Sequence, residues 1–199
     1  MSKNRFKNMD PAYFPSSAQF EAELKSERYK RNYHTALRST VFTLITVAAV
    51  AVLVAVLFLP VLRIYGKSMR GTLDSGDIVV SVKSSDWKTG EVIAFYYNNN
   101  ILVKRVIAST GDWVNLDEDG NVYVNNIKID EPYLDDKAYG ETNIELPYQV
   151  PDGKLFVMGD NRAVSIDSRN TSIGCISEEQ IVGKIVYRVW PFTKIGAVH

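Results

Sequence analysis

A serine in a tight turn is the first candidate for chemistry in this chain. Ser68 lies in the stretch GKSMRGTL, residues 66–73. A serine hydroxyl becomes a nucleophile when a neighbouring base accepts its proton. His34 lies before a long hydrophobic segment, and His199 is residue 199 of 199. Neither is expected to lie near Ser68, so the sequence disfavours a Ser-His-Asp triad. Arg70 replaces the second glycine of a G-x-S-x-G nucleophile elbow. The base is therefore expected to be a lysine or a carboxylate.

A lysine inside an apolar run is the best candidate for that base. Lysine accepts a proton only when neutral, and burial lowers its usual pKa of about 10.4 by up to several units. Lys104 lies in ILVKRVIAS, residues 101–109, with apolar residues on both sides. Because side chains alternate along a strand, we expect Lys104 to be buried while Arg105 meets solvent, or the reverse. The segment alone leaves open that Lys104 is an ordinary surface lysine.

A third polar segment follows an apolar run near the end of the chain. The stretch GDNRAVSIDSR, residues 159–169, contains two arginines, two aspartates and several hydroxyl or amide groups directly after KLFV. Such a cluster at a strand end is too polar for a core, and its density favours a functional loop. An ordinary polar turn with internal salt bridges is the alternative.

One long apolar segment predicts how the chain is anchored. Residues 39–62 carry no charge over 24 positions. A helix of roughly 20 apolar residues spans a bilayer core. Buried core helices are usually shorter, and the apolar part of a cleaved signal peptide is about 7–15 residues long. The sequence therefore predicts an uncleaved transmembrane helix.

The charges that flank this segment predict its orientation. Five basic residues lie in residues 19–38 and three in residues 63–82, which favours a cytoplasmic N-terminus. We therefore expect a cytoplasmic segment over residues 1–38, a transmembrane helix over 39–62 and an extracytoplasmic domain over 63–199. Residues 20–38 are either a helix leading into the anchor or a solvated juxtamembrane segment.

The residues after the anchor favour a mainly β domain. Short runs rich in Val, Ile, Tyr and Phe are bounded by turn residues, and no β-α-β alternation occurs. Asn98–Asn100 and Asp119–Gly120 are typical of hairpin loops. Residues 130–153 are predicted to form an excursion over the surface. The expected strands lie in residues 77–83, 91–97, 101–109, 112–116, 121–126, 154–160 and 181–190.

Composition argues against several classes of function. Lys and Arg together number 23, as do Asp and Glu, so charge gives no support for a nucleic-acid partner. The single cysteine, Cys175, allows neither an internal disulfide nor a cysteine-based zinc cluster. Two distant histidines disfavour a transition-metal site. We expect no metal and no cofactor.

The three polar segments together resemble those of type I signal peptidases. The stretch GKSMRGTL with GDIVV, then KRVIASTGD, then GDNRAVSIDSRNTSIG follow an N-terminal anchor in this order. The single anchor and short outer domain resemble the Gram-positive form. The resemblance covers roughly residues 60–190. It implies an antiparallel β catalytic domain of signal-peptidase type, with an extended apolar face that rests on membrane lipid.

The resemblance also implies a reaction and its residues. Members of the family cleave signal peptides from exported preproteins at the outer membrane surface with a Ser-Lys dyad. By position, Ser68 resembles the nucleophile, Lys104 the general base and Ser165 the hydroxyl that positions the lysine. Supporting residues are implied at Asp160, Asp167 and Arg169, the last two as an ion pair. The implied substrate pocket involves Ile64, Met69, Leu73 and Val103.

Three positions depart from the family pattern. Gly71 and Thr110 stand where the family has turn prolines, and Gly66 stands where some members carry a serine that donates to the oxyanion. These changes keep open a catalytically impaired, signal-peptidase-like binding or assembly factor for surface proteins. A LexA-like self-cleaving protease shares the dyad and a similar β fold, but the anchor argues against it. The preproteins and the oligomeric state stay open.

Overall fold

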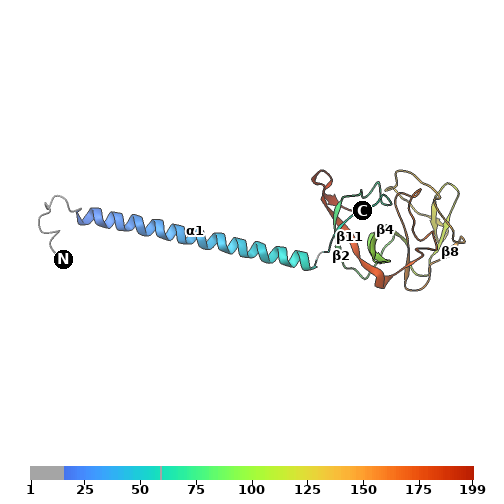
Figure 1. Cartoon of the computed structure of the whole chain (residues 1–199), viewed down its shortest axis with the longest axis horizontal. Helices are drawn as coiled ribbons and strands as arrows, with labels where there is room; N and C mark the ends of the chain where they lie inside the picture. The colour runs from blue at the N-terminus through green and yellow to red at the C-terminus, as the bar shows by residue number, and fades with distance from the viewer. Residues whose placement is uncertain (1–15, 59) are drawn as a thin grey trace. The chain divides into compact units, whose positions relative to one another are not determined.

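A computed structural model describes residues 16–58 and 60–199 of the chain (Figure 1). It divides into two compact units, residues 1–55 and 56–199. The first contains most of helix α1, Ser17–Phe58, and the second contains all the strands.

Helix α1 is long and apolar enough, by length and composition, to cross a membrane over Ser17–Val54. Its described side chains are exposed, including large apolar ones such as Phe42, Leu44 and Val52. A helix in the core of a soluble protein would bury such residues, whereas a bilayer requires them to face outward. The exposed apolar surface of the described helix therefore favours a membrane-spanning segment over a core helix.

The helix boundaries differ from the expected anchor at both ends. The polar residues 20–38 are helical and continuous with the apolar part, and residues 1–15 of the expected cytoplasmic segment lie outside the described residues. The helix ends at Phe58 rather than at residue 62, and Val61–Arg63 forms strand β1. Pro60, which cannot donate a backbone hydrogen bond, accepts one from Ser81 N–H instead. The position of the membrane itself stays a prediction.

The larger sheet has the strand order β1-β2-β11-β3-β4-β9-β10, with β12 paired to β11. Every recorded pairing is antiparallel, which confirms the predicted fold class. Consecutive residues are buried in β3 (Val92–Phe95) and β4 (Lys104–Ala108), so both faces of the sheet are covered there, whereas β11 is only partly buried. Its strands are β1, β2 (Ile78–Val82), β3 (Val92–Tyr97), β4 (Asn100–Ala108), β9 (Lys154–Met158), β10 (Ile176–Ser177), β11 (Ile181–Trp190) and β12 (Gly196–Ala197).

The smaller sheet has the order β7-β6-β5-β8. Its strands are β5 (Trp113–Leu116), β6 (Val122–Val124), β7 (Ile127–Lys128) and β8 (Tyr148–Gln149). Two short 3₁₀ helices, η2 (Glu178–Gln180) and η3 (Phe192–Lys194), precede and follow β11. The expected strand over 121–126 is shorter than predicted because Asn125 and Asn126 adopt positive φ angles of 52° and 66° and turn the chain into β7. Asparagine tolerates this conformation better than most residues.

The predicted hairpin between β3 and β4 is confirmed. Asn98 and Asn99 have φ angles of 43° and 65°, and Tyr97 pairs with Asn100. This two-residue turn fixes the register, so that Lys104 lies opposite Ile93. The turn therefore sets where along the sheet the lysine is placed.

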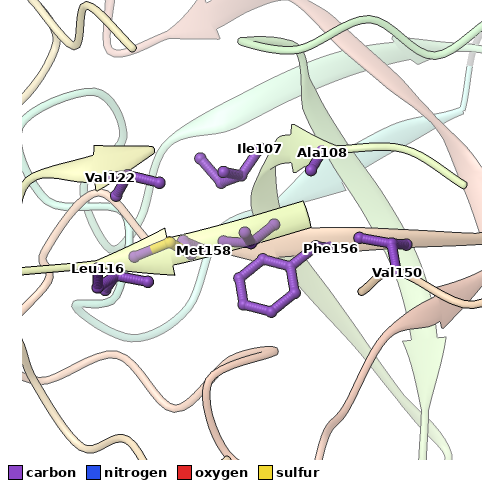
Figure 2. Packing of buried hydrophobic residues seen from close by; sticks show 8 residues of the cluster. Ile107, Ala108, Leu116, Val122, Val150, Phe156 and Met158 are labelled. Atoms are coloured by element: carbon purple, nitrogen blue, oxygen red, sulfur yellow. The ribbon is translucent and has the colours of Figure 1, made fainter. Parts of the chain in front are cut away.

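Three clusters of buried apolar side chains hold these sheets together. One joins the two sheets and includes Ile107 and Met158 of the larger sheet with Leu116 and Val122 of the smaller one (Figure 2). A second lies around Phe95 and Val157. The third contains Ile64, Met69 and Leu73, together with residues of β2, β3 and β11. The third cluster therefore anchors the turn that carries Ser68.

The excursion between β7 and β8 runs through Glu131 and Tyr139 and is not a purely surface feature. Glu131 is buried, and Arg169 Nη1 donates to Tyr139 O at 2.7 Å. Gly140 has a φ of 67°, and a Cβ there would collide with Arg162 O and the Arg169 guanidinium. The excursion packs so closely on these two arginines that only glycine fits.

We expect Gly140→Ala to destabilise the protein more than Gly153→Ala does. Both glycines have a φ of 67°, so both variants incur the left-handed backbone cost of about 1–2 kcal/mol. A Cβ at Gly153 meets nothing within 4 Å, whereas at Gly140 it forces overpacking that costs about 1–3 kcal/mol more. Thermal and denaturant unfolding of the full chain in detergent measures the difference. Equal decreases in the free energy of unfolding for the two variants would show that the excursion moves to accommodate the extra Cβ at no cost.

Candidate active site

The turn that carries Ser68 is fixed by its two apolar neighbours. Met69 and Leu73 are 2% and 0% exposed, and Leu73 N donates to Met69 O at 2.7 Å. Ser68 itself is half-buried, and Lys67 and Arg70 on either side of the turn are exposed. The turn therefore holds the serine at the surface while its neighbours insert into the core.

Gly71 is required by the conformation of this turn. Its φ of 105° is inaccessible to proline, whose ring holds φ near −65°. A Cβ at this position would lie 3.2 Å from Asp135 Oδ2, closer than ordinary packing allows. The departure from the family proline is thus matched by a backbone that glycine alone adopts without strain.

Lys104 lies in β4 and is 3% exposed. Its Nζ donates to Ser165 Oγ at 3.0 Å. Burial lowers the pKa of Lys104 to about 8, while Asp167 acts to raise it and Arg169 to lower it. A lysine with this pKa is neutral in a substantial fraction of molecules near physiological pH, as a general base must be.

Arg105 is also buried, and the expectation that either Lys104 or Arg105 meets solvent is therefore wrong. Arg105 is 0% exposed because its charge is satisfied inside the protein. Its Nε and Nη2 donate to the two oxygens of Asp160 at 2.9 and 2.7 Å. Further bonds reach Gly90 O and Thr72 Oγ1. Both faces of β4 are covered, so strand alternation separates the two side chains without exposing either.

The loop of residues 159–169 is hydrogen-bonded to the backbone oxygens of the Ser68 turn. Asn161 N donates to Ser68 O at 2.9 Å, and Asn161 Nδ2 donates to Lys67 O at 3.1 Å. Gly159 has no room for a side chain, because a Cβ there would collide with both Ser68 O and Ser165 Oγ. The turn, the loop and the lysine partner Ser165 therefore meet at one point.

Asp167 and Arg169 stabilise this loop from within. Arg169 Nε and Nη2 donate to the two oxygens of Asp167 at 2.8 and 2.9 Å, and both side chains are fully buried. Burial acts to raise the pKa of Asp167, but the Arg169 guanidinium and the N–H of Gly159 outweigh it and hold this pKa below its usual range. The pair carries ionised charges that neither partner can lose cheaply.

A groove of about 530 Å³ opens beside Ser68. It is lined by three of the four expected substrate-pocket residues, Ile64, Met69 and Val103. Leu73, the fourth, is fully buried in the core and does not reach the groove. Asn99 and Asn100 at the β3–β4 turn also line the groove, although the sequence suggested only a turn there. The lining combines an apolar wall with a polar end, which suits an extended peptide.

Sequence reasoning missed several buried charges around the site. Arg162 is 1% exposed and paired with Glu131, and Tyr133 stacks on Arg105. Arg162 lies in the polar segment that the sequence had singled out. Glu131 and Tyr133 lie in the excursion, whose sequence lacks any periodic signal. Such partners become visible only when the fold brings them together.

The fold and the site define a class: an antiparallel β domain with a serine at a turn and a buried lysine as its candidate base. Comparison with known proteins identifies the family. The family model described as signal peptidase, peptidase S26, matches residues 37–190. The chain therefore belongs to this family, which consists of serine endopeptidases. The match confirms the resemblance inferred from the three segments.

Two relatives in sequence, both signal peptidases, agree with this assignment. Signal peptidase I of Bacillus amyloliquefaciens is 35% identical over 184 residues, which cover 86% of this chain and 98% of the relative. Signal peptidase IB of Staphylococcus aureus strain COL is 41% identical over 151 residues, or 66% of this chain and 78% of the relative. A crystal structure of a signal peptidase I from Enterococcus faecalis is 27% identical with a TM-score of 0.44, covering 50% of this chain and 97% of that one.

We expect Asp167→Ala to destabilise the fold by about 3–5 kcal/mol, because it leaves the buried Arg169 guanidinium without its partner. The free energy of unfolding, measured in denaturant, tests this. Asp152→Ala, which removes an exposed carboxylate, is the matched control and should change stability by no more than about 0.5 kcal/mol. If both variants unfold at the parent's midpoint, the Asp167–Arg169 pair contributes nothing to stability.

Proposed function

We propose that this protein is a membrane-anchored serine endopeptidase that removes N-terminal signal peptides from exported preproteins with a Ser68–Lys104 dyad. Relatives named signal peptidase I and IB support cleavage of signal peptides. The observation that carries the dyad is the state of Lys104, which is buried, bonded to Ser165 Oγ and has its pKa lowered to about 8.

The reaction begins when neutral Lys104 accepts the proton of the Ser68 hydroxyl. Ser68 Oγ attacks the scissile carbonyl, and Lys104 returns the proton to the leaving amine. An acyl-enzyme ester remains on Ser68. Lys104 then takes a proton from water, which attacks the ester. The proton passes from Lys104 to the leaving Ser68 Oγ, which frees the signal peptide with a new carboxylate and restores the serine hydroxyl and the neutral lysine. In this scheme Ser68, Lys104 and water carry all the proton transfers.

The oxyanion of each tetrahedral intermediate requires a hydrogen-bond donor. The backbone N–H of Ser68 is the proposed donor, by resemblance to the family. Gly66 supplies no hydroxyl at the position where some members carry a serine. The supporting residues act on geometry: Ser165 positions Lys104, while Asp160, Asp167 and Arg169 hold the loop that carries Ser165.

The groove beside Ser68 is proposed to hold the end of the signal peptide. Ile64, Met69 and Val103 form its apolar wall next to the serine. Signal peptides end in an A-x-A-like pattern of small residues. Ile64 and Met69 are packed in the core and Val103 is half-buried, so a larger residue next to the scissile bond would have to displace packed side chains, which favours alanine there. Leu73 acts only indirectly, from the core next to Met69.

The anchor is proposed to place the domain on the outer side of the membrane. The excess of basic residues before the apolar stretch favours a cytoplasmic N-terminus. Residues 64–199 then lie where a translocated preprotein emerges, and membrane lipid becomes a second partner of the β domain.

We expect Ser68→Ala and Lys104→Ala each to reduce preprotein processing on the order of 10³-fold or more, because each removes a reacting group. Processing is measured with purified full-length protein in lipid, and thermal unfolding reports whether each variant is folded. Lys128→Ala changes an exposed lysine on β7 and should process like the parent. Substantial cleavage by folded Lys104→Ala would remove lysine from the mechanism.

We expect kcat/KM to rise with pH through a midpoint near 8, where Lys104 loses its proton. The sign follows from the active form: the neutral amine is the base, so protonation at lower pH abolishes activity. A pH profile between about 6 and 11.5 on a preprotein without titrating groups near its cleavage site tests this. A midpoint near 10.5, the usual lysine value, would contradict a buried base.

A further inference from the structure

Three buried arginines lie in the loop of residues 159–169 or bind it, and each is held in part by the excursion between β7 and β8. Arg105, Arg162 and Arg169 are each 1% exposed or less. Arg169 Nη1 donates to Tyr139 O, a backbone contact that any sequence could provide. The other two arginines are contacted by the side chains of Glu131 and Tyr133, so these contacts depend on residue type.

Glu131 neutralises Arg162 inside the protein. Its carboxylate accepts hydrogen bonds from Arg162 Nη1 and Nη2, and both side chains are 0% exposed. Among the described residues, Glu131 is the one carboxylate that pairs with Arg162. A buried guanidinium without a counter-charge is strongly destabilised, so the position of Arg162 depends on Glu131.

Arg162 transmits this constraint to the centre of the site. Its Nε donates to Gly159 O at 3.1 Å, and its own carbonyl oxygen accepts from Arg169 Nη2 at 3.1 Å. Gly159 is the residue against which Ser165 Oγ and Ser68 O pack. Glu131 is therefore connected through one arginine to the peptide that supports the partner of Lys104.

Tyr133 links this ion pair to the one beside Lys104. Its hydroxyl donates to Glu131 Oε1 at 3.0 Å, and its ring centroid lies 3.7 Å from the Arg105 guanidinium carbon. Burial and the Glu131 carboxylate raise the pKa of Tyr133, so the hydroxyl stays protonated as a donor. Arg105 in turn holds Asp160, which lies at the start of the same loop.

We infer that Glu131 and Tyr133 are positioning residues for the cleavage reaction. Together they fix Arg162 and Arg105, and thereby hold residues 159–169 in the geometry that presents Ser165 to Lys104. Neither residue lines the groove beside Ser68. This inference rests on the proposed Ser68–Lys104 dyad, because positioning has a kinetic effect only where the lysine is the base.

The test separates the chemical step from substrate binding. Glu131→Gln keeps the shape of the side chain but removes the charge that pairs with Arg162. We expect kcat for a preprotein to fall about tenfold to a hundredfold, as small misplacements of reacting groups do. We expect KM to change less than about twofold, because the groove is untouched. Glu145→Gln makes the same chemical change at an exposed position of the excursion and should match the parent.

Tyr133→Phe decides the question where Glu131→Gln does not fold. It removes a single hydroxyl and keeps the ring on Arg105, so we expect a folded protein with kcat lowered about threefold to tenfold, in line with the loss of one hydrogen bond of about 1 kcal/mol. The inference would be overturned if Tyr133→Phe and folded Glu131→Gln had the same kcat as the parent protein. It would also be overturned if these variants lost activity only through a higher KM.

Lys104→Ala, assayed in parallel, shows whether the positioning inference alone fails or the proposed dyad fails as well. If Lys104→Ala is inactive while Glu131→Gln and Tyr133→Phe match the parent, the dyad stands and the positioning role falls. If folded Lys104→Ala still cleaves the preprotein, the dyad falls, and the positioning inference falls with it.

Discussion

The site depends on one constraint: Lys104 must stay out of water and yet be held close to its partner. Burial favours the neutral amine, which is the form that can accept a proton. A neutral amine also loses most of the electrostatic attraction that would keep it in place. Its position therefore has to be fixed by the register of β4 and by the hydrogen bond to Ser165 Oγ at 3.0 Å. The hairpin turn at Asn98 and Asn99 and the loop of residues 159–169 serve this one requirement.

The loop is in turn held by paired charges rather than by apolar packing. Arg105 with Asp160, Arg162 with Glu131 and Arg169 with Asp167 are all buried pairs. Such pairs add little net stability over an apolar core of the same shape, but a displaced partner leaves an uncompensated charge. Alternative loop conformations are thereby penalised more than they would be in an apolar core. The described residues leave no buried side-chain polar atom without a partner, as such a network requires.

Much of the β domain could be predicted from sequence because its strands carry local signals. The seven expected runs correspond to β2, β3, β4, β5, β6, β9 and β11. Strand β1 was missed because residues 61 and 62 continue the apolar run that was assigned to the anchor. Strands of two residues, such as β12, are too short to show periodicity. The polar segment around Ser165 was found by its composition. Burial of Arg105 was missed because strand alternation describes one sheet, whereas Asp160 and Tyr133 arrive from elsewhere in the chain.

The loop of residues 159–169 acts on Lys104 mainly by fixing its position and less by changing its pKa. Burial is the largest influence on the pKa of Lys104, and the opposing effects of Asp167 and Arg169 follow it. Because these two residues form an ion pair, their influences on the lysine partly cancel. A pair of this kind can anchor Ser165 without greatly changing the proton affinity of the base. The fold thus separates two tasks. Burial within β4 and the surrounding core lowers the pKa of Lys104, and the loop of residues 159–169 fixes the position of Ser165, which contacts the lysine.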